Sequence, residues 1–244
     1  MTMPRMRIPG PLLEGAFIAR PNRFLAKVRI KGKTVWAHLP DPGRLKELLI
    51  PGAKVLVEPK NGSKRKTKFA LVMVYQGQQL ISINSNLPNR FTRFCLDNHL
   101  IPELADWTVI RPEYQVGHSR FDFLLGKGTQ KMLLEVKSVT LVEKGVAKFP
   151  DAVTARGRRH VEHLGEMHGE GYAVSVLFIV QRSDATLFMP QWERDPAFAQ
   201  TLADAPEAGV QILVYSAEIT PACMSLKTRL PIILDRPEAV ASLS

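Results

Sequence analysis

Cysteine is scarce in this 244-residue sequence, which holds only Cys95 and Cys223, far apart in ordinary segments. Two such residues cannot build a disulfide framework or a cysteine-rich zinc site, so we expect both thiols to be reduced and buried. Long apolar runs are also absent. No stretch of 18 apolar residues exists, and residues 1–7 lack the apolar segment of a signal peptide. We therefore expect a cytoplasmic protein without a membrane partner.

Acidic residues are few in the first third of the chain. Residues 1–85 contain 16 Lys and Arg against 4 Asp and Glu, a net charge of +12, whereas residues 86–244 contain 17 against 19, a net charge of −2. A charge that served only solubility would be spread along the chain, so this asymmetry indicates a polyanion-binding module joined to a near-neutral one. Nucleic acid is the favoured polyanion, because no amphipathic basic helix for an anionic membrane is evident. Length and charge together predict two domains, 1–85 and 86–244.

The first domain has the pattern of a small β-barrel. Turn-forming Gly, Pro and Asn residues separate about five β-like segments, and a short helical piece follows the second one. Five strands with tight turns and a basic surface favour an OB-fold, with an SH3-like barrel or an open sheet as the alternatives. The expected strands are 17–30, 34–39, 53–58, 69–75 and 79–84, and the expected helix is 43–49.

Two places in this domain are candidate phosphate contacts. The loop 60–68 carries five basic residues, of which we assign Lys64, Arg65, Lys66 and Lys68 to DNA binding. In the segment 20–24, Arg20 and Arg23 flank a bend, and Phe24 is placed to stack on a base. The alternatives are a solvated loop for the first place and a core position for Phe24.

From residue 86 onward the expected order is helix, three strands, helix, strand, helix, strand. This order predicts a mixed sheet with helices on its faces, and it is also the order of the restriction-endonuclease-like core. We expect Asp151 to cap the second helix and Asp195 the third. The expected helices are 86–106, 152–168 and 195–208, and the expected strands are 107–116, 121–125, 132–139, 172–181 and 210–215, with a further edge at 230–234.

Charges interrupt two apolar strands of this domain. Asp122 lies in the first strand of a hairpin, and Glu135 and Lys137 lie in the second. Side chains alternate along a strand, so Glu135 and Lys137 share one face. Burying isolated charges is costly, so an acid and a lysine in an apolar strand need partners or a metal. Carboxylate oxygens suit Mg²⁺ or Mn²⁺, and a nearby lysine fits phosphodiester hydrolysis; a structural ion pair is the alternative.

The helix expected at 152–168 adds a second basic group. Arg156, Arg159 and His160 share a spacing that suits contact with a scissile phosphate of DNA, or else they form a basic outer face. His160 and His163 have the spacing of a zinc pair, but no further ligands accompany them.

Several motifs together resemble the sugar fermentation stimulation protein A family. They lie at 119–125, 135–141 and 149–157 in the second domain, and at 22–25, 38–45 and 65–67 in the first. The resemblance covers nearly the whole chain. It implies an OB-fold followed by a nuclease-like domain of the PD-(D/E)xK superfamily, DNA binding without marked sequence preference, and a regulatory role in sugar (maltose) metabolism.

On this resemblance, Asp122 and Glu135 hold Mg²⁺ or Mn²⁺ with the carbonyl of Val136, and Lys137 orients a water or stabilises charge on the phosphate. Three hypotheses remain open. The protein is a metal-dependent DNA phosphodiesterase, a DNA-binding regulator with an idle nuclease fold, or an RNA-binding or RNA-processing protein. The sequence does not determine the oligomeric state.

Overall fold

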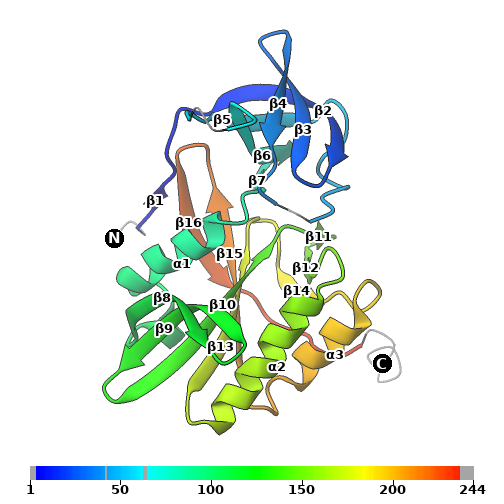
Figure 1. Cartoon of the computed structure of the whole chain (residues 1–244). Helices are drawn as coiled ribbons and strands as arrows, with labels where there is room; N and C mark the ends of the chain where they lie inside the picture. The colour runs from blue at the N-terminus through cyan, green and yellow to red at the C-terminus, as the bar shows by residue number, and fades with distance from the viewer. Residues whose placement is uncertain (1–3, 42, 63–64, 237–244) are drawn as a thin grey trace.

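The computed structural model describes residues 4–41, 43–62 and 65–236. A closed barrel of five strands, with a sixth strand paired to its side, lies at one end of the molecule, and a larger mixed sheet lies at the other (Figure 1). Within the described ranges, no helix is long and apolar enough to cross a membrane.

The barrel is an OB-fold, as the strand pattern predicted. Its strand order is β4-β3-β2-β5-β6-β7, and a parallel pairing of β4 with β6 closes it. Alternate apolar side chains such as Val28, Val55 and Leu71 point inward and are fully buried. The strands are β2 (Leu13–Asn22), β3 (Leu25–Ile30), β4 (Lys33–His38), β5 (Lys54–Pro59), β6 (Phe69–Gln76) and β7 (Gln79–Ser82).

Two local predictions for the barrel are wrong. The segment 17–30 is two strands of a hairpin, and the turn at Arg23 and Phe24 was hidden because the apolar pattern continues through it. The described residues of 43–49 form turns instead of a helix. Leu45 and Leu48 are buried against the barrel, and Leu45 adopts φ 49°, so core packing overrides the helical pattern.

The second domain is built on a seven-stranded mixed sheet with the order β1-β16-β15-β13-β10-β9-β8. The strands β10, β13 and β15 run parallel and the remaining pairs are antiparallel. The strands are β1 (Met6–Arg7), β8 (Thr108–Val116), β9 (Ser119–Lys127), β10 (Gln130–Val139), β13 (Ala173–Val180), β15 (Gln211–Ile219) and β16 (Cys223–Arg229).

Helices cover both faces of this sheet (Figure 1). The helix α1 (Leu87–Asp97) packs on one face, where Phe91 and Leu134 belong to one apolar cluster. The helices α2 (Ala155–Gly169) and α3 (Pro196–Asp204) cover the other face. The mixed sheet, its helices and their order confirm the nuclease-like core. A one-turn helix η1 (Pro102–Leu104) follows α1, and a small sheet of β11 (Val142–Glu143), β12 (Val146–Phe149) and β14 (Leu187–Pro190) lies beside the sheet.

The structure agrees with one of the two predicted helix caps and differs from the strand predicted at residues 230–234. Asp195 caps α3 as expected, with Oδ1 accepting from Phe198 N at 3.0 Å. Asp151 does not cap α2, because Thr154 does. Residues 230–234 do not form a strand, and Ile232 makes only an isolated bridge.

The first strand belongs to the second sheet. β1 pairs antiparallel with β16, so the chain starts in the larger sheet before it enters the barrel. The domain division at residue 85 remains a prediction.

Candidate active site

The hairpin of β9 and β10 opens at the position of the charged residues. The antiparallel ladder runs from Gln130 opposite Lys127 to Leu134 opposite Phe123, and it ends there. β10 continues as the partner of β13 up to Val139. Asp122 and Glu135 therefore lie just beyond the last pair of the ladder, where the separating strands leave room for polar side chains.

Asp122 is held on both carboxylate oxygens. Asn89 Nδ2 from α1 donates to Oδ1 at 2.5 Å, and the backbone N–H of Val136 donates to Oδ2 at 2.7 Å. Burial and the nearby charge of Glu135 raise the pKa of Asp122 to about 6, against an opposing effect of the Val136 N–H and Lys137. A cation bound nearby would therefore stabilise the ionised form of this carboxylate at neutral pH.

Glu135 is 5 % exposed and lies between two basic side chains. Its Oε1 accepts from Lys137 Nζ at 2.5 Å and lies 2.6 Å from His160 Nδ1. Burial acts to raise the pKa of Glu135, but Lys137 and His160 outweigh it and hold the pKa below its usual value. Glu135 Oε2 is buried and accepts no hydrogen bond from the described residues.

The three basic residues predicted on α2 have different positions. Arg156 is exposed and lines the site, with Nε 3.4 Å from His160 Nε2. His160 is 7 % exposed and faces Glu135 from within the domain. Arg159 is exposed and lies outside the pocket lining. Their DNA contacts remain predictions.

His163 does not pair with His160. Its ring stacks on that of His118, with 3.9 Å between the centroids. The two histidines and Glu166 bring their ligand atoms within 4.8 Å of one another. Since His160 is bonded to Glu135, the geometry does not favour the zinc pair considered from the sequence.

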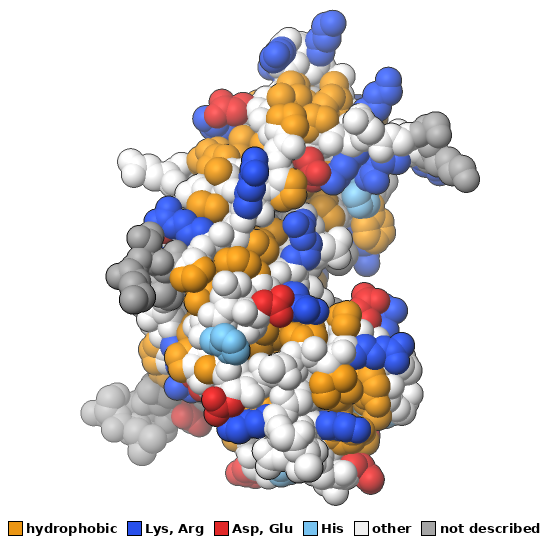
Figure 2. All heavy atoms as spheres, turned by 90° about the vertical axis from the view of Figure 1, so that its left-hand side faces the viewer, with side chains coloured by type: hydrophobic (Ala, Val, Ile, Leu, Met, Phe, Trp, Pro, Cys, Tyr) orange, Lys and Arg blue, Asp and Glu red, His pale blue; other side chains and the backbone are white. Residues whose placement is uncertain are grey.

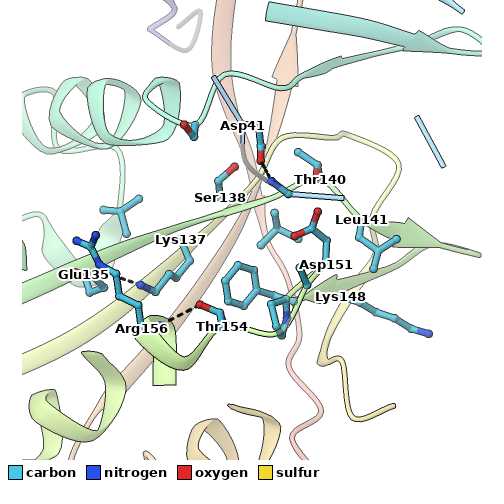
Figure 3. A pocket seen from close by; sticks show the side chains of 18 of the residues that line it. Asp41, Glu135, Lys137, Ser138, Thr140, Leu141, Lys148, Asp151, Thr154 and Arg156 are labelled. Atoms are coloured by element: carbon cyan, nitrogen blue, oxygen red, sulfur yellow. Dashed lines mark hydrogen bonds and ion pairs between the residues drawn. The ribbon is translucent and has the colours of Figure 1, made fainter. Parts of the chain in front are cut away.

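A pocket of about 570 Å³ surrounds the carboxylates, and both domains line it. In Figure 3, Asp41 approaches from the barrel side and Arg156 from α2, while Lys137 extends between them from β10. The polar residues of the lining include Arg23, Asp41, Asn89, Asp122, Glu135, Lys137, Asp151 and Arg156.

The barrel contributes its wall through a loop that one arginine fastens. Arg20 Nη1 donates to the carbonyls of Gly43 and Arg44 at 2.7 Å each, and Nη2 donates to those of Arg23 at 2.8 Å and Asp41 at 3.1 Å. One guanidinium therefore ties the turn between β2 and β3 to the loop around Asp41. No sequence pattern indicated this positioning role, and the DNA contact of Arg20 remains a prediction.

Asp151 joins that loop to the second domain. The backbone N–H of Arg44 donates to Asp151 Oδ2 at 2.8 Å, across 107 positions of sequence. A Cβ added at Gly43 would lie 2.3 Å from the same oxygen, so a side chain here would displace the Asp151 carboxylate. Burial raises the pKa of Asp41 to about 6, and the charge of Asp151 adds to this effect.

The remaining predicted DNA contacts lie on the barrel. Arg23 is exposed and lines the carboxylate pocket. Arg65 and Lys66 line a second hollow with Phe24, which is 51 % exposed and therefore not a core residue. Lys68 is exposed, and Lys64 lies outside the described residues. On the face that Figure 2 shows, the charged side chains of the barrel are mainly basic and lie among hydrophobic ones, whereas acidic and basic side chains mix below it.

Three residues of the site were missed from the sequence: Asn89, Asp41 and Asp151. Asn89 lies on α1, and nothing near it in the sequence distinguishes it from a surface residue. Asp151 was interpreted as a helix cap, although it lies in the segment 149–157, one of the motifs that resemble the family. Only the tertiary structure brings the three to the pocket.

An OB-fold joined to a restriction-endonuclease-like core, with two acids and a lysine at the opening of a hairpin, defines a nuclease-like protein with an appended barrel. Family models match both parts: the sugar fermentation stimulation protein RE domain matches residues 86–223, and the SfsA N-terminal OB domain matches residues 18–83. The chain belongs to the sugar fermentation stimulation protein family.

Curated relatives match along most of their length. The sugar fermentation stimulation protein homolog of Natranaerobius thermophilus is 41 % identical over 229 residues, which cover 92 % of this chain and 95 % of the relative. That of Chloroflexus aggregans is 40 % identical over 235 residues, which cover 95 % and 90 %. The solved structure of Pyrococcus furiosus SfsA in complex with Ca²⁺ is 30 % identical, with a TM-score of 0.87, and the match covers 93 % of this chain and 98 % of that one.

Proposed function

We propose that the protein binds DNA largely independently of sequence and cleaves phosphodiesters at the Asp122–Glu135–Lys137 site with Mg²⁺ or Mn²⁺. The observation that carries this proposal is the convergence of the three side chains in one pocket that both domains line. A buried acid, a half-buried acid and an amine beside a basic barrel are the parts that metal-assisted phosphodiester hydrolysis requires.

The residues present fit a divalent cation. Glu135 Oε2 is a buried acceptor that no described residue satisfies. Burial and the charge of Glu135 raise the pKa of Asp122, so a cation nearby would stabilise its ionised form. An all-oxygen set of Asp122, Glu135 and the Val136 carbonyl suits Mg²⁺ or Mn²⁺. The Ca²⁺ complex of the Pyrococcus furiosus relative supports a divalent cation in this family.

Each protein group has a task in the reaction. When bound, the cation lowers the pKa of a water and neutralises charge on the phosphate. Lys137 offers an ammonium that stabilises negative charge developing on the phosphate oxygens. His160 holds Glu135 in place from the opposite side, at 2.6 Å. Arg156, exposed at the edge of the pocket, orients the phosphate through charge-assisted hydrogen bonds.

A non-catalytic DNA-binding regulator of sugar (maltose) metabolism is the second candidate. One observation favours it: Lys137 and His160 both lie on Oε1 of Glu135, so part of the acid's charge is already neutralised within the protein. In that case, the ion pair serves stability and the barrel alone carries the function.

Incubation of the purified protein with single- and double-stranded DNA and RNA, in Mg²⁺, Mn²⁺ or EDTA, tests the proposal. We expect metal-dependent cleavage of DNA that Glu135→Gln abolishes. Glu218→Gln, which changes a half-buried acid of β15 paired at 3.9 Å with Lys227, is the matched control and should cleave normally. If the wild type cleaved no DNA in either metal, the nuclease proposal would be refuted and the non-catalytic DNA-binding regulator would be favoured.

A further inference from the structure

The turn between β2 and β3 lines part of two hollows. The first is the carboxylate pocket, which Arg23 lines together with residues of the second domain. The second, of about 510 Å³, lies on the barrel and is lined by Asn22, Phe24 and Arg65 among others. Because Arg23 and Phe24 are consecutive, one turn forms part of the wall of both hollows.

This turn is held in place. Asn22 Oδ1 accepts from Phe24 N at 3.0 Å, and Leu39 N donates to Phe24 O at 2.9 Å. Arg20 binds the carbonyl of Arg23 and, through the Asp41 loop, links the turn to Asp151 in the second domain. These hydrogen bonds fix the position of the two hollows relative to each other.

The second hollow has the chemistry of a nucleobase site. Phe24 exposes half of its side chain, 51 %, next to the basic side chains of Arg65 and Lys66. An exposed aromatic ring beside cations is the usual arrangement for stacking one base while the charges follow the phosphates. The neighbouring outer face of the barrel continues it, since Trp36 is 44 % exposed and lies two positions from His38, which lines this hollow.

We infer that single-stranded DNA is the substrate, and that it runs from Phe24, past Arg23, into the carboxylate pocket. This inference rests on the proposed nuclease function and adds the strand class and the path. Stacking on Phe24 needs a base whose face is free, which a paired duplex does not offer. Asp41 and Gly43 of the barrel also line the pocket beside the carboxylates, and the next residue, Arg44, is hydrogen bonded to Asp151, so a strand reaches the carboxylates through a pocket and not across an open platform.

Binding measured without cleavage tests the path. Fluorescence anisotropy in EDTA compares a single-stranded DNA, its duplex and the single-stranded RNA of the same sequence, on the full chain. We expect single-stranded DNA to bind most tightly. Phe24→Ala should weaken that binding by about 5- to 150-fold, the value of one stacked base, and should change duplex binding less than twofold. Ile50→Ala, which truncates a 57 % exposed side chain of the same domain outside both hollows, should leave all three affinities unchanged.

A second variant reports stacking directly. Phe24→Trp should keep the affinity for single-stranded DNA, and its added indole fluorescence should be quenched when the strand binds. Tighter binding of duplex or of RNA, an equal effect of Phe24→Ala and Ile50→Ala, or an unquenched Trp at position 24 would each overturn the inference. Cleavage is scored separately, so a protein that binds single strands through Phe24 and cuts nothing would refute the nuclease function while the binding path stands.

Discussion

Replacing Asp122 by asparagine should stabilise the metal-free protein at neutral pH. Asp122 has a pKa of about 6 in the folded chain, against 3.8 for an ordinary aspartate. Since one pKa unit corresponds to about 1.4 kcal/mol, ionising this buried group costs the folded state up to about 3 kcal/mol at pH 7.5. Asparagine keeps the shape and an oxygen for the N–H of Val136, but carries no charge.

The pH dependence follows from the sign of the shift. The folded state holds the proton of Asp122 more tightly than the unfolded state, so this group makes stability fall as pH rises from about 4 to about 6. Below that window both states are protonated and the penalty disappears. Asp122→Asn should therefore exceed the wild type by about 1 to 3 kcal/mol at pH 7.5 and by well under 1 kcal/mol at pH 4.

Denaturant and thermal unfolding in EDTA measure this difference. For a chain of this size, a gain of about 2 kcal/mol raises Tm by roughly 4 to 8 °C. Adding Mg²⁺ or Mn²⁺ should raise the Tm of the wild type by mass action and leave Asp122→Asn unchanged. Asp106→Asn is the control, because that acid is exposed and pairs with Lys127, and its change should stay within about 0.5 kcal/mol.

One result would refute the reasoning. If Asp122→Asn lowers stability at pH 7.5 in EDTA, the carboxylate is a structural partner of Lys137 and Asn89, and its burial is already compensated without a metal. If Mg²⁺ raised the Tm of Asp122→Asn as much as that of the wild type, the cation would bind elsewhere.

Three further changes test other parts of the structure. Lys137→Ala should leave DNA affinity nearly intact and remove most cleavage. It should also lower the free energy of unfolding by about 1 to 3 kcal/mol, because Glu135 then keeps only His160 as a basic partner. Full cleavage by this variant would exclude Lys137 from the reaction. The double change Arg65→Gln and Lys66→Gln should make the slope of log K for DNA binding against log[salt] less negative by about 1.5. An unchanged slope in a salt titration would mean that these side chains do not contact phosphates. Arg20→Ala should destabilise the protein by about 2 kcal/mol or more in chemical denaturation, because four carbonyls lose a charged donor, and a neutral result would contradict its positioning role.

Local patterns determined the parts of this protein that depend on near neighbours. Alternation along β10 placed Glu135 and Lys137 on one face, and they form an ion pair. Turn residues and apolar runs separated most of the barrel strands, and the order of helices and strands fixed the nuclease-like core. The uneven charge marked the barrel as the basic part. These inferences hold because periodicity and net charge are properties of short segments and of composition.

Tertiary packing decided what lies around the carboxylates. Arg44 and Asp151 are 107 positions apart, and Asn89 and Asp122 are 33 apart, yet each pair is hydrogen bonded. His160 points toward Glu135, and its ring packs edge-on against Phe121 of β9, so it does not lie on a basic outer face. Residues 43–49 do not form the helix that their pattern predicts, because Leu45 and Leu48 are buried in the core of the barrel. Such contacts join elements far apart in the sequence, within a domain or, for Arg44 and Asp151, between the two domains. No local pattern encodes which distant surfaces will meet.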